Sequence, residues 1–203
     1  MRFRLSIVAV IIIFILGLVW GLLVSHDSAS SITNGTGSTG GSSLTNDGTS
    51  PFSAELQPME NLAKFINSLP AWAMFVIILL KNMSAVIFSF ILSPLFLIVP
   101  VFSLVFNGWV IGVVSNQVIA QHSIGYLLAG LLPHGIFEIP ALFIGEAAAF
   151  GFGIAIMRAV VSPNQREQLP AKLKSNLKYL VISLVILVPA ALMETFVTPL
   201  LLR

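Results

Sequence analysis

Long apolar runs alternate with short polar segments along most of this chain. About 20 apolar residues in a helix cross the ~30 Å hydrocarbon core of a bilayer, and five of the runs reach that length. The predicted spans cover residues 3–24, 70–92, 94–118, 124–157 and 179–201. The expected fold class is therefore all-α: a polytopic membrane helical bundle with about five transmembrane helices.

Three regions are expected along the chain. Residues 1–25 form an N-terminal signal-anchor helix, and Arg2 and Arg4 before its apolar run predict a cytoplasmic N-terminus. A cleaved signal peptide is the alternative, although this run exceeds the usual 7–15 residues of a signal's apolar region. Residues 26–57 form a disordered Ser/Gly/Thr tether, because they hold too few apolar residues to fold. Residues 58–203 form the membrane helical domain.

The segment that enters the membrane domain has its own pattern. Residues 58–69 carry apolar side chains at helical spacing, with Glu60 and Lys64 on the other side. They predict an amphipathic helix in the outer interface, or one packed on the outer ends of the bundle. In the tether before it, the sequence Asn34-Gly35-Thr36 matches a glycosylation acceptor.

The fourth run is too long for a simple crossing. Its apolar sequence covers about 35 residues, which as a helix would rise about 52 Å. It contains Pro133, Gly135 and Pro140, and a proline inside a helix removes a hydrogen bond and clashes with the preceding turn. We therefore expect a helix break near Pro133 and Gly135, with a half-helix or an interfacial segment near residues 124–132 followed by one crossing.

Composition agrees with a membrane protein and narrows the chemistry. Of the 203 residues 57% are hydrophobic and 9% are charged, with a mean hydropathy of +0.99. The net charge of +2 comes from so few groups that no nucleic-acid partner is indicated, and the absence of cysteine excludes disulfides and thiolate sites. Residues 158–178 form the most basic loop and should be cytoplasmic, which leaves residues 26–69 outside.

Polar side chains within the apolar runs are candidate functional residues, because burying them in lipid is costly. Lys81 should pair with a glutamate, either to hold helix register or to serve transport or catalysis. His134 and Glu138 share a helix face, so the carboxylate can orient the imidazole. Two asparagines are expected to hydrogen-bond between helices. The predicted intramembrane cluster comprises Lys81, Asn82, Asn107, His134, Glu138, Glu194 and Thr198; Glu146 is a further charged residue in an apolar run.

Other patterns indicate packing rather than catalysis. Ala141, Gly145, Ala149 and Gly153 repeat every four residues, as in helices that approach closely in lipid; a ligand-lined groove is the alternative. The membrane runs contain one histidine, and neither HExxH nor GxSxG occurs, so zinc hydrolysis and serine catalysis are not expected. We therefore expect no catalytic residues, no metal and no cofactor.

The segment LLPHGIFEIPALFIGEAAAFGFG over residues 131–153 resembles the signature of the stage II sporulation protein M family. Two further pieces agree: KNM…SP…P…NGWVIG over 81–112 and AALMETFVTPLL over 190–201. The resemblance covers about 65–203, so the tether looks like an insertion. Its matched positions are Asn107, Gly108, His134, Glu138, Pro140, Glu194 and Thr198. The pair Lys81-Asn82 departs from the paired asparagines common in the family.

The resemblance implies a helical inner-membrane protein of about five spans without an established catalytic residue. In spore formers the family acts with stage II sporulation proteins D and P, which degrade peptidoglycan during engulfment, and it localises that complex.

Three hypotheses for function follow. The first is a non-enzymatic membrane scaffold that organises a membrane or envelope-remodelling complex. The second is a small-solute or ion transporter or channel that uses Lys81, His134, Glu138 and Glu194, and the third is an intramembrane hydrolase. The expected location is the cell membrane, with several passes. The expected partners are the lipid bilayer and membrane or envelope proteins, and a homo-oligomer is left open.

Overall fold

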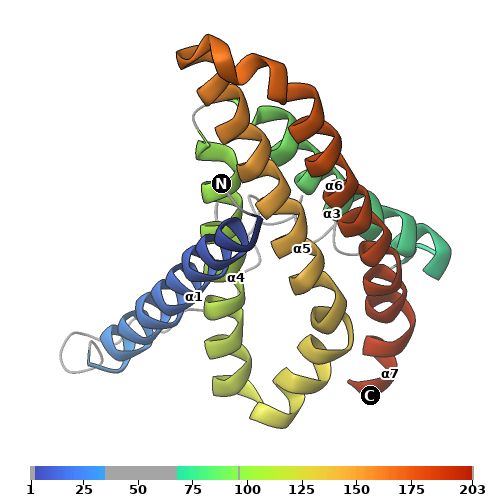
Figure 1. Cartoon of the computed structure of the whole chain (residues 1–203). Coiled ribbons are helices and arrows are strands. Elements are labelled where there is room, and N and C mark those ends of the chain that lie inside the picture. The colour runs from blue at the N-terminus through green and yellow to red at the C-terminus, as the bar shows by residue number, and fades with distance from the viewer. Residues whose placement is uncertain (1–2, 35–67, 96, 203) are drawn as a thin grey trace, which may run out of the picture.

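The computed structural model describes residues 3–34, 68–95 and 97–202, and for residues 25–34 it describes the backbone alone (Figure 1). Helices and turns make up the described part, which contains no strand. Five helical stretches there are long and apolar enough to cross a membrane. The all-α membrane bundle expected from the sequence is therefore confirmed.

From α3 onward the helices follow one another with short connections. They are α1 (Phe3–Asn34), α3 (Ala71–Leu92), α4 (Ile98–Gln121), α5 (Ile124–Val161), the 3-10 helix η1 (Pro163–Gln168), α6 (Leu169–Leu192), the π-helix η2 (Met193–Val197) and α7 (Thr198–Leu201). The backbone of α1 continues past its predicted span to Asn34. Residues 35–67, which hold most of the predicted tether and of the amphipathic helix, lie outside the described residues.

The basic segment 158–178 is helical rather than a loop. The end of α5, the whole of η1 and the first turns of α6 cover it almost completely. The segment is rich in leucine, alanine and lysine, which favour helices, and Pro170 lies in the first turn of α6, where the missing N–H has no helical partner. The connection between the fourth and fifth spans, predicted as a loop, is therefore helical over most of its length.

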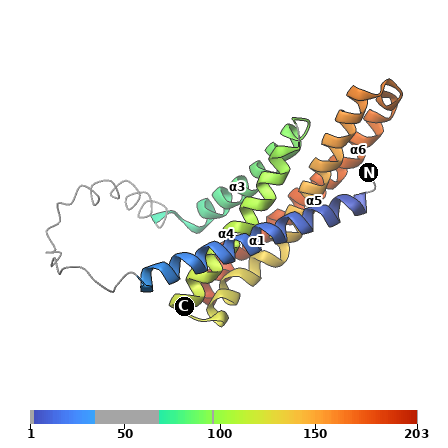
Figure 2. The same cartoon turned by 90° about the vertical axis from the view of Figure 1, so that its left-hand side faces the viewer.

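Helices α1 and α4 cross at a contact without intervening side chains (Figures 1 and 2). A Cβ atom on Gly17 or Gly21 would overlap the main chain of α4, and one on Gly108 or Gly112 would overlap that of α1. Each helix therefore offers a Gly-x-x-x-Gly face, which permits close van der Waals packing in lipid. Beyond the crossing, the Asn116 side-chain amide donates to the Leu22 carbonyl at 2.7 Å.

The second half of α5 occupies the centre of the bundle, with α1, α3, α4 and α6 packed around it. Residues 145–149 are all buried, and two groups of apolar side chains extend from them, one toward α3 and α6 and the other toward α1 and α4. Because lipid tails are as apolar as leucine, close packing rather than water exclusion holds these helices together.

The predicted break in the fourth span is not confirmed. Helix α5 runs through Pro133, Gly135 and Pro140 without interruption, starting after Ser123, whose hydroxyl accepts from the Tyr126 N–H at 3.2 Å. Its path instead changes direction in the first half of the helix (Figure 1). Bending around a proline sacrifices one hydrogen bond, whereas a full break would leave several backbone groups unpaired in lipid.

Candidate functional site

Three polar residues predicted from the sequence meet at one point of the bundle. His134 and Glu138 lie one turn apart on α5, and Glu194 lies on η2. One ligand atom from each, an imidazole nitrogen or a carboxylate oxygen, lies within 4.8 Å of the other two. All three side chains are half-buried. The fold therefore joins residues about 60 positions apart in the sequence into a single acid–imidazole cluster.

The π-helix η2 determines where Glu194 lies. A π turn inserts one extra residue into a helix and rotates the following side chains, and such turns are frequent at functional sites. Pro199 follows this turn and has no N–H to continue the ordinary α-helical pattern. The Thr198 hydroxyl donates to the Met193 carbonyl at 3.3 Å, and the Thr195 hydroxyl is buried without a partner in the described structure.

The charges around Glu138 act in opposite directions. Glu194 repels its carboxylate, while protonated His134 and the ammonium of Lys81 attract it. Lys81 is exposed on α3 and forms no ion pair with a carboxylate of the described residues. The predicted Lys81–glutamate pair is therefore not formed. Its ammonium acts on Glu138 through space, without a direct contact.

The cluster has the composition of a small-ion or proton site. The Nδ1 atom of His134 is buried without a hydrogen-bond partner within the described ranges. One imidazole nitrogen and two carboxylate oxygens form a donor set that suits a divalent cation, and the same groups can exchange a proton. An apolar pocket of about 230 Å³ between α4 and the first half of α5 reaches His134. The expectation that no metal binds stays a prediction.

The asparagines do not join helices as predicted. The Asn107 amide donates to the Ser103 carbonyl at 2.7 Å, one turn back on the same helix. Asn82 is half-buried on α3 and makes no hydrogen bond within the described structure. A side chain that bonds within its own helix is satisfied locally, so it has no need of a partner across the bundle. The interhelical amide is that of Asn116, near the end of α4.

A second polar cluster, which the predicted site omitted, lies deeper in the bundle. Glu146 is completely buried on α5, and its two carboxylate oxygens accept from the hydroxyls of Ser89 on α3 and Ser103 on α4. The Ser103 bond is 2.8 Å long. Three helices thus share one carboxyl group. Ser89 and Ser103 lie inside otherwise apolar runs, and a buried hydroxyl needs a hydrogen-bond partner. These two serines were therefore the sequence signal that could have predicted this cluster.

The four predicted packing positions on α5 are all buried. A Cβ atom on Gly145 would overlap the side chains of Val86 and Ser183, and one on Gly153 would overlap the Ser93 carbonyl. Ala141 and Ala149 are fully enclosed, and the Ser183 hydroxyl donates to the Ala141 carbonyl at 2.6 Å. This face of α5 therefore contacts α3 and α6 directly at these positions.

Comparison with known proteins identifies relatives of the whole bundle. The sequence model of the family described as Stage II sporulation protein M matches residues 10–199. The match begins inside α1, so this helix belongs to the matched unit, which extends well before residue 65, where the resemblance was expected to begin.

An uncharacterized protein of Methanocaldococcus jannaschii is 31% identical over 98 residues, which are 48% of this chain and 55% of that protein. The chain thus spans about half the length of this relative. No solved structure matches the chain.

Proposed function

The chain belongs to the stage II sporulation protein M family, and from this premise we propose that it is a non-enzymatic membrane scaffold that recruits partners to a membrane or envelope-remodelling complex. The partners in this proposal are other membrane or envelope proteins, and a second copy of the chain is a further candidate. Membership of the family and the five helices that are long and apolar enough to cross a membrane support a role within the membrane.

The observation that carries the proposal is the packed middle of the bundle. Residues 145–149 of α5 are buried without exception, and Glu146 among them is bonded to hydroxyls of α3 and α4. A bundle whose central polar group is satisfied internally has a fixed shape, because close-packed interiors resist deformation. A fixed shape suits a protein that presents constant outer faces to partners.

The absence of a catalytic arrangement in the described residues also supports a non-enzymatic role. No serine hydroxyl there is hydrogen-bonded to a histidine, as it is in the serine–histidine arrangement of nucleophilic catalysis. The hydroxyls of Ser89 and Ser103 are instead bonded to the buried carboxyl of Glu146.

Orientation in the membrane forms part of the proposal. The ring of Phe3 stacks on that of Tyr179 at 3.7 Å, which places the start of α1 beside the basic end of the α5–α6 hairpin. Basic residues favour the cytoplasmic side, so we place residues 158–178 and the N-terminus there and residues 26–69 outside.

Partner capture from native membranes tests the scaffold. The full-length tagged chain is crosslinked in its membrane, purified and compared with Gly153→Leu, Glu138→Gln and Gly125→Leu. A bulky side chain at Gly153 meets the α3 end directly, so we expect partner recovery to fall several-fold. Recovery with the Gly125 variant, where a Cβ would make only ordinary contact with the Ser123 hydroxyl, and with Glu138→Gln should equal that of wild type. Loss of partners in Glu138→Gln alone would contradict a purely packing-based scaffold.

A transporter is the second candidate, because His134, Glu138 and Glu194 converge beside a π turn and one imidazole nitrogen is unpartnered. Intramembrane ionisable groups commonly mark ion and proton pathways. Proteoliposomes containing the full chain are assayed for proton and cation flux. Flux that disappears in Glu138→Gln would establish transport, and equal background leakage in both proteins would eliminate it.

A further inference from the structure

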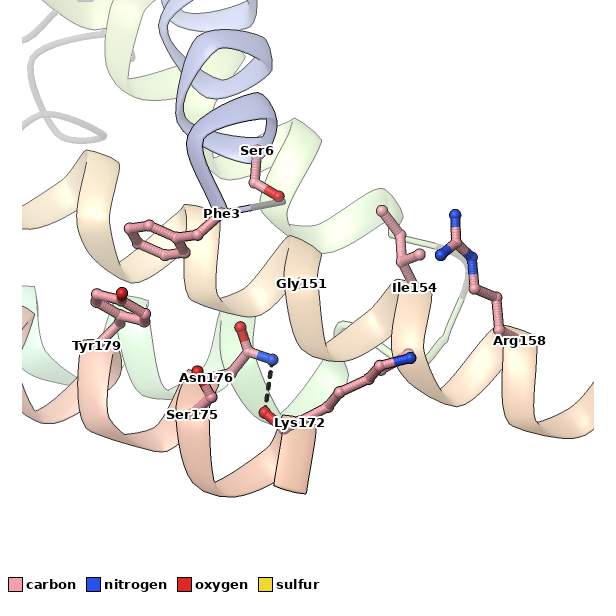
Figure 3. A pocket seen from close by; sticks show the side chains of 10 residues that line it. Phe3, Ser6, Gly151, Ile154, Arg158, Lys172, Ser175, Asn176 and Tyr179 are labelled. Carbon is pink, nitrogen blue, oxygen red and sulfur yellow. Dashed lines mark hydrogen bonds between the residues drawn. The ribbon is translucent and has the colours of Figure 1, made fainter. Parts of the chain in front are cut away.

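A polar pocket lies between α1, α5 and α6, away from the acid–imidazole cluster (Figure 3). Its volume is about 130 Å³, roughly four times the ~30 Å³ that a water molecule occupies in the liquid. The side chains and backbone that matter for its chemistry are those of Ser6, Gly151, Arg158, Lys172, Asn176 and Tyr179. The pocket is therefore large enough for a tetrahedral oxyanion.

Two cationic groups line this pocket, and no carboxylate does so among the described residues. Arg158 extends from the end of α5 and Lys172 from the start of α6, and both charged ends lie toward the same side of the pocket (Figure 3). Lys172 donates to the Gln165 side chain at 3.4 Å, a long bond that leaves two ammonium hydrogens. With two cations and no carboxylate in its lining, the pocket has a net positive charge.

An unsatisfied hydroxyl lines the same pocket. Ser6 is 2% exposed, and its Oγ atom has no hydrogen-bond partner in the described part of the chain. A buried hydroxyl without a partner is costly and therefore rare, which indicates a group that the structure does not contain. A serine hydroxyl beside two cations is a typical set of donors for a phosphate oxygen.

The wall opposite Ser6 is formed by a close contact between Asn176 on α6 and Gly151 on α5. The Asn176 amide donates to the Lys172 carbonyl at 2.8 Å, and its oxygen lies directly over Gly151, where a Cβ would overlap it. This arrangement fixes the start of α6 against α5 and so fixes the backbone that carries Lys172. Glycine at position 151 is thus required for the shape of the pocket.

The pocket also lies where the apolar run of α1 meets the basic α5–α6 hairpin. The Phe3–Tyr179 stack closes its inner side, where the apolar run of α1 begins, and the basic hairpin continues beyond it. The boundary between an apolar run and a basic segment corresponds to the level of lipid headgroups.

We propose that this pocket binds a phosphate group, supplied either by the headgroup of an anionic phospholipid or by a soluble phosphate-bearing molecule. Arg158 and Lys172 contribute charge-assisted hydrogen bonds, and the Ser6 hydroxyl donates to a third oxygen. This site is independent of the scaffold proposal and holds equally for a transporter.

The test uses the full-length chain in a neutral detergent and measures its thermal unfolding with increasing ligand. The probes are phosphatidylglycerol, phosphatidylcholine and inorganic phosphate. The pocket variant is Arg158→Gln/Lys172→Gln, and its control is Lys174→Gln/Lys178→Gln, which removes two exposed charges of the same segment outside the pocket. A third variant, Ser6→Ala, removes the unpartnered hydroxyl and keeps both charges.

Phosphatidylglycerol should raise the unfolding temperature of wild type and control at the same concentration. The pocket variant should need at least about tenfold more lipid, because hydrogen bonds to charged groups are lost, and Ser6→Ala should also bind more weakly. Displacement of the lipid by inorganic phosphate identifies a site open to soluble phosphates, and lack of displacement identifies a lipid site. Equal responses of the pocket and control variants, or equal effects of the two lipids, would overturn the proposal. Lipid retention in native mass spectrometry gives the same comparison for a variant without a measurable transition.

Discussion

Helix α5 carries two glutamates, Glu138 and Glu146, eight residues or roughly 12 Å apart, whose surroundings are opposite. Glu138 is half-buried and lies close to a second carboxylate and an imidazole, and its carboxylate accepts no hydrogen bond from the described residues. Glu146 is completely buried and accepts two hydroxyl donors from different helices. The two glutamates therefore differ in kind: Glu146 is bonded inside the packed bundle, whereas Glu138 remains available to a proton or a cation.

The glycines of α5 also differ between its two halves, in the space that each would leave for a Cβ atom. A Cβ atom on Gly130 or Gly135 would meet its nearest neighbour at 3.8 Å, which is ordinary contact. A Cβ on Gly145, Gly151 or Gly153 would overlap atoms of a neighbouring helix. The first half of α5 therefore has room to adjust its side chains, while the second half is fixed by its neighbours. A functional rearrangement would more easily occur around Glu138 than around Glu146.

The largest expected effect comes from replacing each glutamate by alanine. Glu146→Ala leaves a cavity, and the hydroxyls of buried Ser89 and half-buried Ser103 lose their acceptor, so we expect a loss of about 2–5 kcal/mol in the free energy of unfolding. Glu138→Ala removes an unbonded side chain and its repulsion with Glu194, so the loss should stay below about 1 kcal/mol. Reversible unfolding in mixed micelles measures both. Equal losses would remove the distinction between the two sites.

The glycine comparison should give the next largest difference. Gly153→Ala forces the ends of α3 and α5 apart and should cost about 1–3 kcal/mol of unfolding free energy. Gly130→Ala should be neutral or stabilise by up to about 1 kcal/mol, because alanine favours the helix and a Cβ fits there. The same unfolding assay applies, and a destabilised Gly130 variant would show that the first half of α5 is packed as tightly as the second.

Removing one donor to Glu146 should have a smaller effect. Ser103→Ala deletes the 2.8 Å bond to the carboxyl, and we expect a loss of about 1 kcal/mol. Thr198→Val deletes a longer bond of 3.3 Å to a backbone carbonyl in the π turn and should cost less than half as much. If the threonine variant proves the more damaging, the π turn is the more constrained region, contrary to the comparison above.

The smallest effect is expected at Lys81. Its side chain is exposed and unpaired within the described structure, so Lys81→Gln should change the unfolding free energy by less than about 0.5 kcal/mol. Glu138→Gln serves as the reference, since the two residues interact only through space. A loss as large as that of Glu146→Ala would indicate that Lys81 does pair with a carboxylate in the bilayer.

Much of the fold was predictable because it depends on local properties. Run length and hydropathy located five spans, and the boundaries of α3 and α4 differ from prediction by a few residues. The spacing of His134 and Glu138 placed them on one helix face, and Glu194 was included in the same predicted intramembrane cluster. Asn107 and Lys81 were misjudged, because whether a polar side chain bonds locally, bridges helices or extends outward depends on its neighbours in space.

The sequence by itself therefore determined that this protein lies in a lipid bilayer and that the chain crosses it about five times. Both follow from transfer free energy and helix rise, which are additive along the chain. Only the tertiary structure decided which carboxylate is enclosed, because Ser89, Ser103 and Glu146 lie far apart in sequence and on three helices. It also decided that Ser6 lines a cationic pocket between α5 and α6. Contacts between helices depend on crossing positions, and these follow from close packing at glycines on both partners rather than from either segment alone.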